Sequence, residues 1–186
     1  MRHVELARYE SDADGLAILE PVDERVDYVR GPAWSPLIVE YGDYECAYSR
    51  RAFREIERAE RELRGTLRFA FRHFPLTQIH AHAFAAAAAA EAAALQGHFW
   101  EMHSLLFQRQ DALADADLRV YAEELGLDGV RFERDRNGIA VLRRVRRDIA
   151  SGLATGSIYG TPTLFIDGVV HRGPTDASSL IAALRR

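Results

Sequence analysis

The chain contains a single cysteine, Cys46, in the segment Glu45-Cys46-Ala47-Tyr48-Ser49. A β-rich apolar run over residues 37–41 precedes it, and a helical pattern begins at about Tyr48. The N-terminus of a helix carries partial positive charge and unpaired backbone N–H groups, and both favour a thiolate over a thiol. We therefore expect Cys46 to be a nucleophile toward disulfides. The alternative is an inert, buried structural cysteine.

Ser49 lies three residues after Cys46. Residues three apart share one side of a helix, so we expect its hydroxyl to face Cys46 and to be able to donate to the thiolate. A hydroxyl cannot resolve a mixed disulfide, so resolution would have to come from an external thiol. A solvent-facing serine at the start of a helix is the alternative.

Composition narrows the class of protein. The chain has 186 residues, of which 48% are hydrophobic, which fits one globular domain. A formal charge of −4 gives no electrostatic case for nucleic acid or an anionic membrane as partner. All 24 residues counted as lysine plus arginine are arginine, which excludes a lysine Schiff base and a Walker-type phosphate loop.

The expected location follows from three absences in the sequence. No apolar run has the length of a membrane span, and residues 1–31 lack the apolar core of a signal peptide. One cysteine also allows no internal disulfide. We therefore expect a cytoplasmic protein with no membrane partner.

The pattern of elements predicts an α/β fold with one inserted all-helical lobe. Residues 1–24 look like a polar lead-in, ordered around 16–19. A β–α–β unit is followed by a helical block, a hairpin at Asp167-Gly168 and a last helix. The expected strands cover 27–30, 37–41, 67–74, 163–166 and 169–171, and the expected helices cover 48–63, 83–95, 99–108, 115–125 with an aspartate cap, 130–136, 139–153 and 176–184.

Three landmarks in this order resemble the thioredoxin superfamily, in its DsbA-like branch. They are the segment 40–49, the helical insertion, and the segment Gly160-Thr161-Pro162-Thr163-Leu164-Phe165-Ile166-Asp167-Gly168. The resemblance implies a thioredoxin fold with an inserted helical lobe. Its predicted parts are a lead-in (1–25), a first thioredoxin part (26–78), a helical insertion (79–156) and a second thioredoxin part (157–186).

The resemblance also assigns roles to residues around Cys46. It implies a cis bond before Pro162, with the backbone of Thr161 pairing with the substrate chain. Ala47 and Tyr48, inside the motif, are then substrate-facing positions.

Glu40, six residues before Cys46, matches the family's buried acidic residue. Burial would raise the pKa of this carboxyl and make it a candidate proton shuttle. A satisfied core carboxylate is the alternative.

Two departures from the family pattern set the expected chemistry. Ser49 replaces the usual second cysteine, and Ala47 replaces the common proline. The serine form is similar to monothiol glutaredoxins and to glutathione-using relatives of DsbA, such as kappa-class glutathione transferases and 2-hydroxychromene-2-carboxylate isomerases. We therefore expect a monothiol thiol–disulfide oxidoreductase with no tightly bound cofactor. Its co-substrate would be glutathione, bacillithiol or mycothiol, and its substrate a disulfide-containing or glutathionylated protein or small molecule.

Two other functions remain open at this point. One is a glutathione transferase or isomerase that uses the helical lobe as an apolar pocket. The other is a non-catalytic binding or redox-sensing domain. The histidine spacings, such as His80 to His82 and His98 to His103, do not fit zinc ligation, so we expect no metal site. The arginine-rich run 143–147 is read as a solvated helix face, with an anion site as the alternative.

Overall fold

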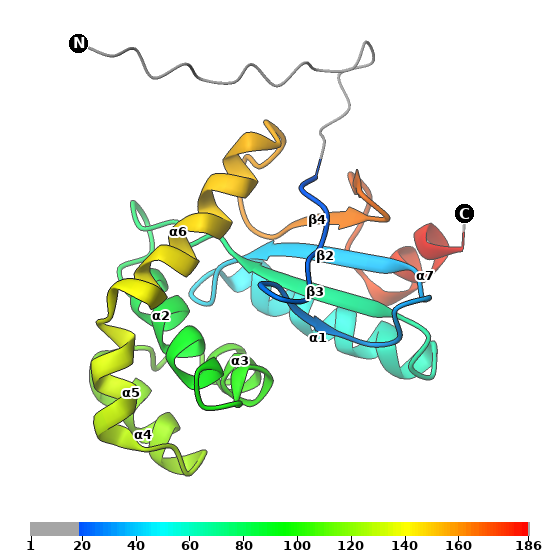
Figure 1. The fold of residues 1–186 in the computed structure, drawn as a ribbon. Helices are drawn as coiled ribbons and strands as arrows, with labels where there is room; N and C mark the ends of the chain where they lie inside the picture. The colour runs from blue at the N-terminus through cyan, green and yellow to red at the C-terminus, as the bar shows by residue number, and fades with distance from the viewer. Residues whose placement is uncertain (1–18, 186) are drawn as a thin grey trace, which may run out of the picture.

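The computed structural model describes residues 19–185 (Figure 1). Most of the predicted lead-in lies outside this range, but Leu19 is described and is buried. The elements follow the predicted order closely. They are β1 (Tyr28–Arg30), β2 (Leu37–Gly42), α1 (Ala47–Glu62), β3 (Arg68–His73), α2 (Ala83–Ala94), α3 (Phe99–Gln108), α4 (Asp115–Glu124), α5 (Gly129–Arg136), α6 (Ile139–Ala154), β4 (Thr163–Ile166), β5 (Val169–Val170) and α7 (Ala177–Leu184).

The sheet has the order β1-β3-β2-β4-β5, so β2 is the central strand. It pairs in parallel with β3 through the α1 crossover and antiparallel with β4, which comes from the far end of the chain. A nearly continuous apolar run suits β2 because this strand is buried on both faces. The carboxyl end of β2 therefore delivers Cys46 to the start of α1.

Helices cover both faces of the sheet (Figure 1). Phe53 and Ile56 of α1 and Leu180 of α7 pack with Ile38 on one face, while Ile149 of α6 packs with Val39 on the other. The buried residues of α1 recur at helical spacing, as the sequence pattern predicts.

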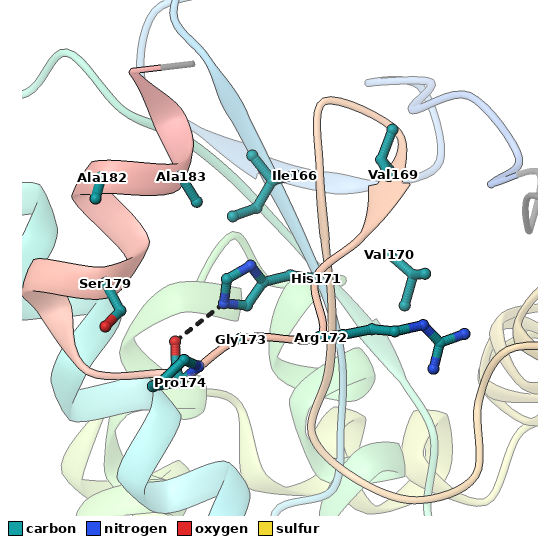
Figure 2. Close-up of a pocket in the computed structure, with 10 residues that line it drawn as sticks. All are labelled: Ile166, Val169, Val170, His171, Arg172, Gly173, Pro174, Ser179, Ala182 and Ala183. Atoms are coloured by element: carbon teal, nitrogen blue, oxygen red, sulfur yellow. Dashed lines mark hydrogen bonds between the residues drawn. The ribbon is translucent and has the colours of Figure 1, made fainter.

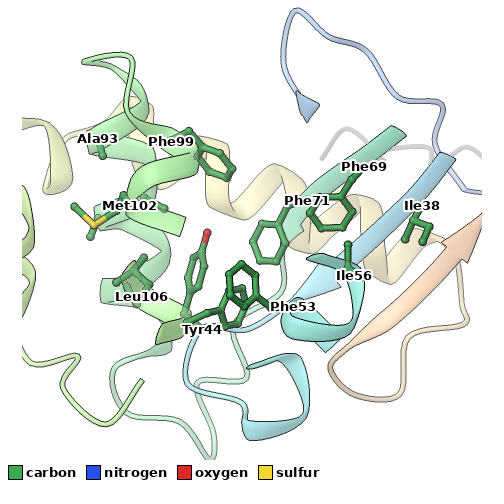
Figure 3. Close-up of a cluster of buried hydrophobic side chains, with 14 of the residues drawn as sticks. Ile38, Tyr44, Phe53, Ile56, Phe69, Phe71, Ala93, Phe99, Met102 and Leu106 are labelled. Atoms are coloured by element: carbon green, nitrogen blue, oxygen red, sulfur yellow. The ribbon is translucent and has the colours of Figure 1, made fainter. Parts of the chain in front are cut away.

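The helical insertion shares its core with the sheet. Figure 3 shows the rings of Tyr44, Phe53, Phe71 and Phe99 gathered between the α1 face of the sheet and the insertion. Nearly every alanine of α2 is buried, and α3, α5 and α6 all pack against this helix, because small side chains let neighbouring helices approach. The insertion is thus an integral wall beside the end of β2 where Cys46 lies.

One predicted cap is wrong. We expected an aspartate to cap the helix that begins near residue 115, but Ala114 occupies the cap position of α4. The carboxylate of Asp117 reaches back and accepts from the Ala114 N–H at 3.0 Å. An acid in the first turn satisfies a free N–H there and also meets the positive end of the helix dipole.

Within residues 19–185, no helix combines the length and the apolar character needed to cross a bilayer.

Candidate active site

Cys46 occupies the cap position of α1, with extended backbone angles. Its Sγ donates a hydrogen bond to the carbonyl oxygen of Thr161 at 3.1 Å, and the Thr161–Pro162 peptide bond is cis. Residue Cys46 is only 5% exposed, while its neighbours Ala47 and Tyr48 are exposed. The fold therefore brings together Cys46, Thr161 and Pro162, with one side of the thiol facing the proline loop.

Ser49 is placed differently from our expectation. Its side chain is fully buried, and its Oγ accepts from the backbone N–H of Asp43 at 3.3 Å. Among the described residues, no hydrogen bond joins Ser49 to Cys46. The serine thus closes the loop that leads into α1, and it offers the thiol no second sulfur.

The carboxylate of Asp43 fixes the start of this loop. One oxygen accepts from the Glu45 N–H at 2.8 Å, and the other accepts from the Leu76 N–H at 2.8 Å and from Nδ1 of His80 at 2.7 Å. The loop is therefore tied to the segment that leads into the helical insertion.

The insertion itself reaches the loop through two residues that sequence reasoning missed, His103 and Gln110. The side-chain amide of Gln110 donates to the carbonyl oxygens of Tyr44 at 2.6 Å and Cys46 at 2.9 Å. No local pattern could reveal these contacts, because more than sixty residues separate the partners.

His103 holds the Tyr44 side chain. The Tyr44 ring belongs to the aromatic cluster of Figure 3, and its hydroxyl lies 3.0 Å from Nδ1 of His103. Burial lowers the pKa of His103 well below its usual range and raises the pKa of Tyr44 well above its own. The ring of His103 is therefore neutral, and its hydrogen bond with the phenol orients Tyr44, two positions before Cys46.

Glu40 is fully buried on β2, as predicted. Neither carboxylate oxygen has a hydrogen-bond partner among the described residues. Burial raises the pKa of Glu40 to about 8, against a lowering contribution from the charge of Arg30. The carboxyl is therefore mostly protonated at neutral pH. Its role as a proton shuttle stays a prediction.

A cavity of about 460 Å³ adjoins the thiol loop. Glu45 and Ala47, which flank Cys46, line it together with His82, Arg50 and Gln110. The carboxylate of Glu45 accepts from the backbone N–H of His82 at 2.6 Å and contacts Nδ1 of the same residue at 3.1 Å. Residues of both the thioredoxin part and the insertion line this cavity, and their side chains include both positive and negative charges.

A separate hollow of about 580 Å³ lies between β5 and α7 (Figure 2). His171 is one of its lining residues, and its Nε2 lies 3.0 Å from the Pro174 carbonyl oxygen. Its lining residues all fall within 166–183, so it includes no member of the thiol loop.

Three buried potential metal ligands also meet, although their spacing in sequence gave no sign of it. Single ligand atoms of His73, Glu91 and Asp148 all lie within 4.8 Å of one another. Arg144 forms ion pairs with both acids, and Tyr28 donates to Glu91 at 2.7 Å. The guanidinium already supplies the positive charge that these acids require, so we interpret the group as an ion-pair network.

The same network corrects our interpretation of the arginine run. Arg144 and Arg147 turn inward and pair with the buried Asp27 and Asp148, while Arg143 and Arg146 are exposed. Only part of the run is therefore a solvated face.

Comparison with known proteins decides the family. A sequence profile described as thioredoxin matches residues 25–186. The chain belongs to the thioredoxin family. Among solved structures, a thioredoxin-like oxidoreductase from Silicibacter pomeroyi is 25% identical, with a TM-score of 0.78 and coverage of 95% of this chain and 97% of that one. BdbD from Bacillus subtilis is 19% identical, with a TM-score of 0.77 and coverage of 91% and 96%, and it supports the fold alone.

This thioredoxin-family chain thus has the DsbA-like fold of thiol–disulfide oxidoreductases, with the inserted helical lobe expected from the sequence. The relatives found by sequence are named as antiporters and not as oxidoreductases. A Na(+)/H(+) antiporter NhaA 1 from Mycolicibacterium vanbaalenii is 45% identical over 173 residues, which are 91% of this chain and 28% of that protein. NhaA 3 from Salinispora tropica is 46% identical over 177 residues, 91% of this chain and 26% of that protein. The chain therefore spans little more than a quarter of these curated relatives.

Proposed function

We propose that this protein is a monothiol thiol–disulfide oxidoreductase that acts through Cys46 and is regenerated by an external low-molecular-weight thiol. The observation that carries the proposal is the position of its only sulfur nucleophile, 3.1 Å from the Thr161 carbonyl oxygen and beside the cis-linked Pro162. The buried Ser49 supports regeneration by an external thiol, because a hydroxyl cannot resolve a mixed disulfide.

The reaction has two exchange steps. In the first, the Cys46 thiolate attacks one sulfur of a disulfide, the old S–S bond breaks, and the other sulfur leaves as a thiolate that takes up a proton. In the second, an external thiolate attacks the mixed disulfide and Cys46 leaves as a thiolate. Glu40 is the proposed proton shuttle beneath the site, because its buried carboxyl is unpaired and its pKa of about 8 is suited to exchange near neutral pH.

The substrate side follows from the exposed part of the motif. Tyr48 is 74% exposed, and Tyr159, just before the proline loop, is 86% exposed. We propose that these rings and Ala47 contact a disulfide-containing or glutathionylated substrate, while the backbone of Thr161 pairs with it. Glutathione or an equivalent thiol is the proposed co-substrate, with no tightly bound cofactor. Such a thiol supply implies a reducing compartment, so the proposed location is the cytoplasm.

Replacing the buried serine tests the monothiol assignment. Ser49→Cys supplies a second sulfur one helical turn from Cys46, so oxidation should form an internal disulfide and an adduct on Cys46 should be released without added thiol. Free-thiol titration and intact-mass measurement after oxidation would detect both changes. Ser178→Cys, on α7, is a matched control that should not resolve the adduct. If Ser49→Cys behaves like the parent protein, the resolving argument fails.

The names of the relatives favour a second candidate function. Proteins called Na(+)/H(+) antiporters share 45% identity with nearly the whole chain. This supports a redox-sensing domain that works together with such a transporter, a partner outside our expectation of no membrane association. Cation transport in vesicles containing the antiporter and this chain, with and without oxidant, should depend on Cys46. If, under oxidant, vesicles with the Cys46→Ser variant transport cations at the same rate as vesicles with the parent chain, this candidate is excluded.

A further inference from the structure

We propose that His82, oriented by Glu45, is the general base for the external thiol, and that the cavity of about 460 Å³ beside Cys46 is where this thiol binds. The inference rests on the proposed monothiol function and adds to it a binding site and a proton acceptor. The thiol would be a small zwitterion that carries carboxylate and ammonium groups.

The contacts of Glu45 fix the orientation of His82. One carboxylate oxygen accepts the backbone N–H of His82 at 2.6 Å, and the other lies 3.1 Å from Nδ1. A carboxylate is an acceptor only, so Nδ1 carries a hydrogen, and Nε2 is the ring nitrogen left to accept a proton. Nε2 has no hydrogen-bond partner among residues 19–185. The side chain of His82 is 48% exposed, which leaves it accessible to a ligand.

This arrangement includes the two residues that flank the nucleophile in the chain. Glu45 and Ala47 immediately precede and follow Cys46, and both line the same cavity as His82. Gln110, which binds the carbonyl oxygen of Cys46, lines it as well. A thiol bound in this cavity would therefore lie against the two residues that flank Cys46, close to a base held in one orientation. An orienting acid, a histidine and a reacting hydroxyl or thiol form a general catalytic arrangement.

The cavity also carries charges that select the ligand class. Arg50 offers a guanidinium for a carboxylate, and its pairing with the largely exposed Asp111 at 3.6 Å is loose. Asp111 and Asp117 offer carboxylates for an ammonium group. Cavities of this volume hold ligands of the size of a small peptide. Together these features match a short thiol peptide such as glutathione better than an uncharged thiol.

The proposed step balances as follows. Nε2 of His82 takes the proton from the external thiol R–SH, and the resulting thiolate attacks the outer sulfur of the mixed disulfide Cys46–S–S–X. The S–S bond to Cys46 breaks, R–S–S–X forms, and Cys46 leaves as a thiolate. The external thiol is oxidised and the Cys46 sulfur is reduced, while the proton on His82 passes to solvent.

The test uses the full chain with a glutathione adduct prepared on Cys46 by treatment with glutathione disulfide. Release of the adduct by glutathione and by 2-mercaptoethanol is followed by mass spectrometry, and each rate is divided by the rate at which Cys46 reacts with iodoacetamide. This ratio separates loss of a base from general damage to the thiol. His171→Gln, in the hollow between β5 and α7, is the matched histidine control.

We expect His82→Gln to lower the ratio for both thiols by at least about tenfold, since general bases contribute about 10²–10⁴-fold. Added imidazole should restore release in His82→Gly, which a purely structural role would not allow. Arg50→Gln should slow release by glutathione more than release by 2-mercaptoethanol. An adduct that His82→Gln releases as fast as the parent does, or a His82→Gly variant that imidazole does not rescue, would overturn this inference alone. Failure of Cys46 to form any adduct would overturn the proposed function and this inference with it.

Discussion

The two faces of the sheet bury charge in opposite ways. On the α1 face, Glu40 is fully buried and its carboxylate has no partner among the described residues. On the α6 face, Arg72 is also fully buried, but it donates to both carboxylate oxygens of Asp27 at 3.1 and 2.9 Å and to the Tyr41 hydroxyl at 2.9 Å. An unpaired acid stays neutral by holding its proton, while a paired one stays charged.

This difference indicates that the Arg72–Asp27 pair is structural, while Glu40 is able to react. Arg72 also donates to the carbonyl oxygens of Glu20 and Pro21, so it fastens the segment before β1 over the sheet. Burial alone would raise the pKa of Asp27, but its hydrogen bonds with Arg72 hold that pKa below its ordinary value. Glu40 has no such anchor and adjoins the strand end that carries Cys46, so its proton is the one available for chemistry.

Breaking the buried ion pair of Arg72 and Asp27 should have the largest effect on stability. Arg72→Met leaves Asp27 buried with only the longer contacts to Arg147, at 3.2 Å, and Arg144, at 3.9 Å, and it leaves several acceptors without a donor. We expect a loss of about 3–5 kcal/mol in the free energy of unfolding, measured by urea denaturation. The double variant Arg72→Met/Asp27→Leu removes both charges and should recover much of that loss. A double variant as unstable as Arg72→Met alone would show that the pair is not the source of the effect.

Replacing the unpaired Glu40 with a residue that cannot ionise should instead stabilise the protein at alkaline pH. The pKa of Glu40 rises from 4.5 to about 8 on burial, so the folded state keeps a proton that the unfolded state loses. Stability is therefore full below about pH 4.5 and falls as pH rises to 8, by roughly 4 kcal/mol if the site does not relax. Glu40→Gln cannot ionise, so its free energy of unfolding at pH 8.5 should exceed that of the parent by roughly 2–4 kcal/mol. Identical pH dependence of the two proteins would contradict the assignment of a neutral carboxyl.

Removing a neutral hydrogen-bonding side chain, Gln110, should change the free energy of unfolding less than these changes of charge do. Gln110→Ala removes two donors from the carbonyl oxygens of Tyr44 and Cys46, which should cost about 1–3 kcal/mol in the free energy of unfolding. It should also slow the reaction of Cys46 with iodoacetamide, because the loop loses its hold on the insertion. Gln96→Ala is the matched control, because Gln96 is a half-buried glutamine of the same insertion and its side chain binds the backbone of Asp128. Equal effects of the two substitutions would exclude a special role for Gln110.

The sequence was sufficient for most of the fold and for the centre of the site. Apolar spacing, alanine content and turn residues predicted the strands and helices to within about two residues, since these patterns are local. The family resemblance, carried by the motif around Cys46 and by the Thr161-Pro162 pair, predicted that the two segments meet, although 115 residues separate Cys46 from Thr161. The burial of Glu40 followed from its place in an apolar strand.

What the sequence did not reveal are contacts made by single polar side chains across the fold. His103 lies in α3 and Gln110 in the turn that follows this helix, and nothing local marks them as partners of the thiol loop. Arg144 and Arg147 look like part of a charged surface but turn toward buried acids. Ser49 follows the helical spacing, yet its hydroxyl meets Asp43. Such choices depend on which elements pack together, and periodicity does not specify that.

The central claim is that Cys46, although only 5% exposed, is a nucleophile that forms one mixed disulfide and depends on an external thiol for release. Mass spectrometry of the purified protein after treatment with glutathione disulfide, with and without excess glutathione, tests it most directly. We predict a single glutathione adduct on Cys46 that excess glutathione removes completely. An unmodified protein, or an adduct that glutathione does not remove, would contradict the account.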